Sequence, residues 1–171
     1  MKKMISLVFI AFLSINAFAQ DDMMEEETPK TDDVRLGVNI GTTSGDEMSR
    51  DRFSTNFTVD FTYLLPVTSN LKVGGHLAYT RLAINDNKTI STEFDEGFLS
   101  FSGTFRLYND SGKFFIGSDF GYGYGLEDGG FLYRPRVGFQ ISECSGLNIS
   151  YIDLNDTVKY NAVTIGYEFI F

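Results

Sequence analysis

The C-terminal segment constrains the fold of this chain more than any other stretch. Residues 158–171 read VKYNAVTIGYEFIF. From Val163 to Phe171 every second residue is large and apolar or aromatic, and the positions between them are mostly small or polar. A period of two is typical of a β-strand with one apolar and one mixed face. The sequence stops on the aromatic Phe171, unlike the polar, frayed ends of most soluble domains.

The N-terminal segment has the pattern of a bacterial export signal. Lys2 and Lys3 precede an apolar run over residues 5–15, and Ala17-Phe18-Ala19 supplies a small-x-small cleavage pattern. The run is too short to span a bilayer as a helix. We therefore expect residues 1–19 to be a cleaved signal peptide that directs export to the periplasm. The alternative of a retained membrane anchor fits the length and the flanking residues less well.

The composition of the mature chain is strongly acidic. Removal of Lys2 and Lys3 with the signal changes the formal net charge from −9 to −11. Seven of the acids lie in residues 20–33, which we expect to form a disordered acidic periplasmic tail. Nucleic acid is not an expected partner, because neutralising phosphates requires Lys and Arg. Cys144 is the only cysteine, so no internal disulfide can form.

Alternating segments separated by turn-like residues fill the rest of the sequence. They predict strands over residues 34–42, 52–65, 71–84, 94–108, 113–126, 131–142, 147–153 and 158–171. After the signal there is no apolar run near 18 residues, and a spanning chain without such a helix must close its strands. We expect an all-β fold over residues 34–171, an eight-stranded antiparallel up-and-down transmembrane β-barrel.

The connections between these segments alternate in character. Residues 66–70, 109–112 and 143–146 are turn-like, whereas two of the others, 43–51 and 85–93, are clearly longer. Short turns at one end and longer loops at the other are typical of barrels in the bacterial outer membrane, where the short turns face the periplasm. The expected location is therefore the outer membrane, with both termini on the periplasmic side.

The distribution of charge predicts which face of each strand lines the lumen. One face is nearly free of charge, and its Tyr and Phe residues gather toward strand ends, as in interfacial girdles. The opposite face carries glycines and both signs of charge, which suits a narrow lumen. The expected lumen charge network comprises Arg35, Asp60, Lys72, His76, Glu96, Arg106, Asp119, Arg134, Arg136 and Glu168. A soluble barrel with an apolar interior remains an alternative. Pro135 cannot donate to a ladder, so we expect a bulge there.

Strand number, turn asymmetry and the closing YEFIF together resemble the small eight-stranded outer-membrane barrels of the OmpA/OmpX type. The resemblance covers residues 34–171. It implies a plugged lumen, function carried by surface loops, and an assembly signal at Tyr167, Phe169 and Phe171 that the barrel-assembly machinery reads. The chain lacks the periplasmic peptidoglycan-binding domain of larger relatives, so no peptidoglycan role is expected.

The lumen charges allow two interpretations. They either fill the barrel as a salt-bridge network, which an eight-stranded interior favours, or line a narrow channel or small-solute site. We expect Arg134, Arg136, Asp119 and Glu168 to be the main members. His76 is expected to fill the lumen, since it lies in the wrong leaflet and on the wrong face for a lipid-modifying enzyme. No catalytic residue, cofactor or metal site is expected.

The remaining candidate contacts lie at the outer end of the barrel. Arg50, Arg52, Arg81 and Lys88 could pair with lipopolysaccharide phosphates, or could be ordinary surface charge. The sequence therefore predicts a monomeric, non-enzymatic surface-interaction scaffold, whose partners are outer-membrane lipid, lipopolysaccharide and an extracellular loop partner. The alternatives are a narrow channel or solute binder and, less favoured, a lipid-modifying enzyme.

Overall fold

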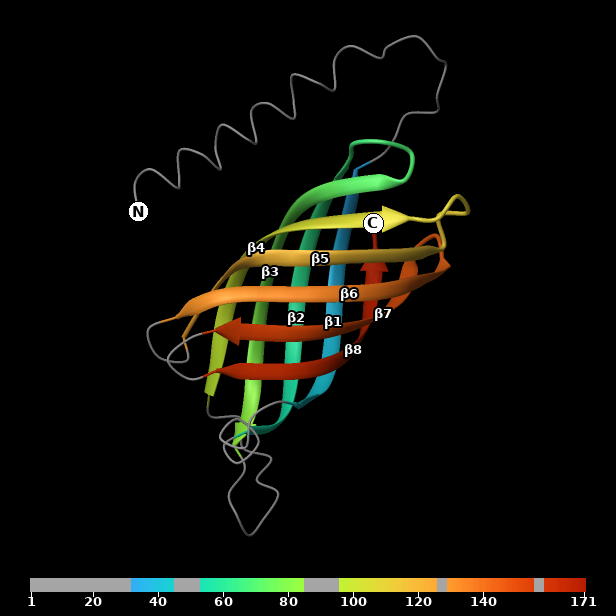
Figure 1. The fold of residues 1–171 in the computed structure, drawn as a ribbon. Coiled ribbons are helices and arrows are strands. Elements are labelled where there is room, and N and C mark those ends of the chain that lie inside the picture. The colour runs from blue at the N-terminus through green and yellow to red at the C-terminus, as the bar shows by residue number, and fades with distance from the viewer. Residues whose placement is uncertain (1–31, 45–52, 85–95, 126–128, 156–158) are drawn as a thin grey trace, which may run out of the picture. The chain divides into compact units, whose positions relative to one another are not determined.

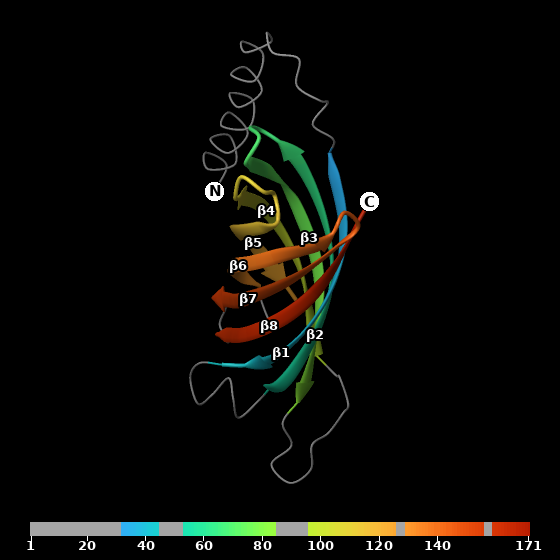
Figure 2. The ribbon, with the colours of Figure 1, turned by 90° about the vertical axis from the view of Figure 1, so that its right-hand side faces the viewer.

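A computed structural model describes residues 32–44, 53–84, 96–125, 129–155 and 159–171. These residues form a closed antiparallel barrel of eight strands in sequence order (Figures 1 and 2). The strands are β1 Asp33–Thr43, β2 Phe53–Pro66, β3 Leu71–Ile84, β4 Glu96–Tyr108, β5 Phe114–Tyr124, β6 Gly130–Ser142, β7 Ser145–Asn155 and β8 Tyr160–Ile170. The expected fold class is therefore confirmed.

The strand boundaries differ from the expected ones by at most two residues. The boundary of β1 changes the expected place of Asp33, which was predicted to be the last residue of the acidic tail. Asp33 instead begins β1, where it pairs in register with Leu64 of β2, and its carboxylate lies 2.8 Å from both the Arg35 guanidinium and the Lys72 ammonium. Residues 1–31 lie outside the described part of the chain.

Closure of the barrel depends on β8 lying against β1. Their antiparallel register runs without a break from Arg35↔Ile170 to Thr43↔Ala162. The Phe171 amide extends this pairing by donating to the Val34 carbonyl over 2.9 Å. A closed ladder leaves no strand edge with unpaired backbone groups.

The two ends of the barrel are distinguished by their connections. At one end, here named the turn end, residues 67–70, 109–113 and 143–144 join the strands, and β1 begins and β8 ends. At the other, here named the loop end, the connections are residues 44–52, 85–95, 125–129 and 156–159. Most residues of the loop-end connections lie outside the described ranges.

Alternation along every strand separates an exposed apolar face from a buried lumen. Outward side chains such as Ile40, Phe101 and Ile165 are 62 %, 59 % and 58 % exposed. Inward side chains such as Arg106 and Asp119 are completely buried. An exposed apolar surface of this extent marks a face that contacts lipid or protein. No helix in the described ranges is long and apolar enough to cross a membrane.

The bulge expected at Pro135 does not occur. Pro135 pairs in register with Ser118 of β5, and the β6–β7 register keeps the same offset from Tyr133↔Asp153 to Arg136↔Ser150. Only the intervening pairs are missing from the β6–β7 ladder, because proline has no amide hydrogen to donate. In the described strands, register shifts occur between Phe53 and Thr55 and between Gln140 and Ser142.

Candidate functional site in the lumen

Glu168 of β8 is the central acceptor of the lumen. The Arg106 guanidinium of β4 holds it with two hydrogen bonds, Nη1 to Oε2 over 2.7 Å and Nη2 to Oε1 over 2.9 Å. Arg35 and Arg136 each donate to it over 3.1 Å, and the Asn148 amide over 3.2 Å. Charge-assisted and bidentate hydrogen bonds of this kind are the strong ones in proteins. Glu168 therefore connects four other strands of the barrel wall to β8.

Asp119 of β5 forms the second centre. Its Oδ2 accepts from Arg136 Nη2 over 2.6 Å and from Arg134 Nε over 2.8 Å. His76 Nε2 lies 3.5 Å from the same oxygen. Arg136 donates to both Asp119 and Glu168, so the two carboxylates belong to one network.

A third group lies at the turn end of the lumen. Arg35 Nη2 donates to Asp33 over 2.8 Å and to the Tyr108 hydroxyl over 2.9 Å. Lys72 Nζ also donates to Asp33 over 2.8 Å and lies 5.6 Å from the centre of the Tyr108 ring. Sequence reasoning missed Asp33, because an acid at the end of an acidic run looks like part of that run.

Asp60 is held differently from the other buried acids. The Asn39 amide donates to Asp60 Oδ2 over 2.6 Å, and Asp60 Oδ1 is buried without a hydrogen bond. The sequence offers no charge signal that would have identified Asn39 or Asn148 as network members. The available signal is that strand alternation places both residues at inward-facing positions, on β1 and β7.

All ten residues of the expected lumen network fall within the described ranges. Eight of them are buried, whereas Lys72 and Glu96 are only partly buried. The four expected main members do meet, through Arg134–Asp119, Arg136–Asp119 and Arg136–Glu168. The structure adds Arg106 and Arg35 as partners of Glu168. Such pairing compensates part of the large desolvation cost of burying each charge.

An apolar cluster lies toward the loop end of the lumen, which the sequence analysis did not predict. Phe98 and Tyr160 form its aromatic pair, with ring centres 5.6 Å apart in an edge-to-face arrangement. Its members are Leu82, Phe98, Leu132, Ile152, Leu154, Tyr160 and Ala162. All are buried, and they come from β3, β4, β6, β7 and β8. The available signal was the loss of polar residues at inward positions of β7, where Ile152 and Leu154 follow Ser150.

The residues of the expected assembly signal lie on the outer face of β8 and just beyond its end. Tyr167 and Phe169 are 37 % and 44 % exposed, and their ring centres lie 4.9 Å apart. Phe171 is 75 % exposed. Of the candidate lipopolysaccharide contacts, Arg81 is exposed on β3. Arg50, Arg52 and Lys88 lie outside the described residues.

The lumen geometry does not supply an accessible catalytic centre within the described residues. His76 and Asp119 approach each other, and Ser102 is the register partner of His76. The sequence analysis did not expect a serine beside this pair. The side chains of His76 and Asp119 are fully buried, and neither ring nitrogen of His76 nor Ser102 Oγ has a hydrogen bond. These groups therefore lie inside the lumen and do not face the outer surface of the barrel.

Comparison with known structures identifies the fold. No protein-family model and no curated protein matches this sequence. The outer-membrane protein Ail of Yersinia pestis in a phospholipid nanodisc is similar, with a TM-score of 0.56 and 15 % identity over 82 % of this chain and all of Ail. Neisserial surface protein A gives a TM-score of 0.51 and 13 % identity over 82 % of this chain and 97 % of that protein.

A designed protein shares the same architecture. The de novo design TMB2.3 gives a TM-score of 0.51 and 11 % identity over 83 % of this chain and 97 % of the design. Its likeness at low identity shows that strand pattern and closure, rather than particular side chains, are common to these proteins. The chain has the fold of the small eight-stranded outer-membrane β-barrels, the OmpA/OmpX-type architecture.

Proposed function

We propose that this protein is an outer-membrane barrel with a closed lumen that acts as a rigid scaffold for its loop-end surface. The observation that carries the proposal is the convergence of Arg35, Arg106 and Arg136 on Glu168 inside the lumen. The apolar cluster at the loop end adds a second barrier to ions. The charged network and the apolar cluster occupy the lumen at two levels along its length, which supports a structural role over a conducting one.

The exposed apolar face supports placement in a membrane. Outward residues of all described strands form a belt without charged side chains in its middle, represented by Val38, Val59 and Ile149. A membrane supplies the apolar surroundings that such a belt requires. The short connections at the turn end support a periplasmic position for that end.

The partners of the scaffold are part of the same proposal. The β8 aromatics Tyr167, Phe169 and Phe171 are proposed as the signal for the barrel-assembly machinery. Arg81 is proposed to contact lipopolysaccharide phosphate near the loop end, with an extracellular partner on the loops. The closed ladder gives no edge strand for sheet extension between copies, which supports a monomer.

A solute-flux assay tests the closed lumen. Residues 20–171 are refolded into vesicles loaded with a chloride-sensitive or potassium-sensitive dye. Folded insertion is verified by protease resistance of the barrel. A flux equal to that of protein-free vesicles is expected, and a flux that rises with the amount of inserted barrel would contradict the proposal.

A narrow channel or small-solute site is the second candidate, and one observation favours it. His76, Asp60 and Ser102 each bury a polar atom that has no hydrogen bond among the described residues. Buried polar atoms are normally satisfied by protein or by ordered water, so this part of the lumen can accept a polar guest. Flux that disappears in a His76→Leu variant would support this candidate over the closed scaffold.

A further inference from the structure

The buried charges inside the lumen do not balance. Within the described ranges, four arginines lie there with three acids. These residues are Arg35, Arg106, Arg134 and Arg136, with Asp60, Asp119 and Glu168, and each is at most 3 % exposed. Lys72 and Asp33 pair with each other at the turn end and do not change the balance. One buried positive charge therefore has no matching acid, and protonation of His76 would add another.

No other described acid can balance this charge. Glu96 is the remaining inward acid of the described strands, and it lies at the loop end of β4. It is ten positions from Arg106, roughly 33 Å of strand, with the buried Phe98 of the apolar cluster between them. An arginine in a protein does not release its proton, so the excess charge cannot disappear by titration. Burying an uncompensated charge is costly, so this excess calls for a counter-ion.

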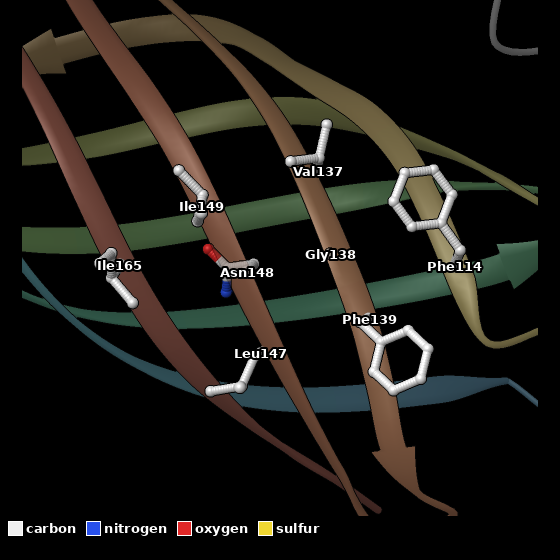
Figure 3. A pocket seen from close by; sticks show the side chains of 8 residues that line it. All are labelled: Phe114, Val137, Gly138, Phe139, Leu147, Asn148, Ile149 and Ile165. Carbon is white, nitrogen blue, oxygen red and sulfur yellow. The ribbon is translucent and has the colours of Figure 1, made fainter.

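The outer face of the wall offers no counter-charge beside Glu168. Asn148 of β7 donates to Glu168 over 3.2 Å and is neutral. Its neighbours Leu147 and Ile149 line an apolar groove on the outer surface together with Val137 (Figure 3). Asn148 is the one polar residue among those that line this groove. The counter-ion must therefore lie inside the lumen.

The four arginines also have unused hydrogen-bond donors. Each buries one nitrogen that has no hydrogen bond among the described residues, namely Arg35 Nε, Arg106 Nε, Arg134 Nη2 and Arg136 Nε. Two carboxylate oxygens, Asp60 Oδ1 and Asp119 Oδ1, are without a hydrogen bond as well. Ordered water can complete such hydrogen bonds but carries no charge. A small anion accepts hydrogen bonds and also balances the positive charge.

A row of polar side chains beside Arg134 locates the site. Thr62 of β2 pairs in register with His76 of β3, which pairs with Ser102 of β4. Each of the three buries a polar atom that has no hydrogen bond in the described part of the chain. Arg134 Nε and His76 Nε2 approach the same oxygen of Asp119, over 2.8 and 3.5 Å. The row therefore lies next to the Arg134 guanidinium, whose Nη2 has no partner there.

We propose that this row binds one small monovalent inorganic anion of the size of chloride. The hydroxyls of Thr62 and Ser102, a ring N–H of His76 and Nη2 of Arg134 donate to it. The anion is small because an eight-stranded interior is only wide enough for side chains. The inference goes beyond the scaffold role, since the anion is part of the lumen packing and is bound rather than conducted.

Replacement of chloride by gluconate at constant ionic strength tests the binding. Gluconate is too large to enter the row, so only chloride should stabilise the folded barrel. Refolded residues 20–171 in detergent should unfold at a midpoint about 5 °C higher in chloride than in gluconate. Lys113→Gln removes an exposed positive charge at the turn end and should keep this difference in full.

A matched pair of variants at Ser102 tests the location. Ser102→Asp brings a carboxylate into the row, so it should lose the chloride effect and be at least as stable in gluconate as Ser102→Asn. Ser102→Asn has the same shape without the charge and should keep the chloride effect. In a lumen without excess positive charge, the buried carboxylate would instead make Ser102→Asp much the less stable variant.

Removal of the excess charge gives a third measurement. Arg134→Gln leaves the arginines and acids of the lumen equal in number, so its unfolding midpoint should be the same in chloride and gluconate. The Ser102 pair decides the matter if Arg134→Gln does not fold. The Ser102→Asp background also measures any general effect of the two salts on the barrel.

Three results would overturn the inference. Equal midpoints of the unmodified barrel in the two salts would mean that water alone completes the network. An equal chloride effect in Ser102→Asp and Ser102→Asn would place the anion elsewhere. Much lower stability of Ser102→Asp than of Ser102→Asn in gluconate would show that the lumen has no charge to balance. The expected pattern together with chloride flux into vesicles would support the site while contradicting the closed lumen, so the two proposals fail separately.

Discussion

Arg106 and Glu168 face each other across the lumen with two hydrogen bonds of 2.7 and 2.9 Å. The pair joins β4 to β8, which are not neighbours in the barrel wall. The Arg106 guanidinium also stacks over the Phe115 ring, with Cζ 4.6 Å from the ring centre. Both side chains are at most 2 % exposed. The pair therefore links the packing of the lumen to the stability of the barrel wall.

Removing the charge of Glu168 should destabilise the barrel strongly. Glu168→Gln leaves Arg35, Arg106 and Arg136 without their shared carboxylate, and breaking a buried pair typically costs about 3–5 kcal/mol. Urea unfolding in lipid vesicles measures the loss. Asp110→Asn, at an exposed turn position, is the matched control and should change stability by no more than about 0.5 kcal/mol. Similar values for the two variants would contradict the account of the network.

The apolar cluster predicts a contrast between two phenylalanines on β4. Phe98 is buried in the cluster, so Phe98→Ala should leave a cavity and cost about 3–5 kcal/mol. Phe101 faces outward, and Phe101→Ala should cost less, because lipid tails can fill the space. The same urea titration compares the variants. A larger loss for Phe101→Ala would show that the inward and outward faces are reversed.

The apolar belt predicts a strong effect of position on a new charge. Val59 lies in the middle of β2 and is 40 % exposed, so Val59→Arg should cost about 2–4 kcal/mol in a membrane. Val67→Arg, in the adjoining turn, places the same charge at the end of the barrel and should cost little. The measurement is the yield of folded protein on refolding into vesicles. Equal yields would place Val59 outside the hydrocarbon.

Two adjacent glycines of β3 test the packing of the strand at the level of a single methyl group. A Cβ at Gly74 would meet the Tyr63 backbone, whereas a Cβ at Gly75 would meet nothing within 4 Å. Gly74→Ala should therefore cost about 1–3 kcal/mol by overpacking. Gly75→Ala should be neutral or stabilise by about 0.4–1 kcal/mol, because it restricts the unfolded chain. Thermal unfolding of both variants in the same detergent decides whether the order is as stated.

The strand pattern was predictable because a period of two is a property of the sequence itself. The bounds expected for β3 agree with the structure at both ends, and a long alternating run with clear turn residues before it explains this. Pro135 was misread because a lost ladder hydrogen bond does not require an extra residue. The β6–β7 register simply continues past it.

The contents of the lumen were only partly predictable. Charged residues at inward positions differ clearly from the apolar residues that alternate with them along the strand. The sequence could therefore identify Arg134, Arg136, Asp119 and Glu168. Which of these side chains touch depends on the strand register around the closed barrel. The alternation along each strand gives the face of a residue but not that register. The apolar cluster was missed because an inward Ile152 beside an outward Tyr151 makes both faces of β7 look alike.

The most direct test of the closed lumen is single-channel current from residues 20–171 in a planar bilayer. The account predicts no discrete conductance steps from the inserted barrel, because the Glu168 network and the apolar cluster both fill its interior. Reproducible steps whose size or ion selectivity changes in Arg106→Gln would contradict it and would make the lumen a conducting pathway.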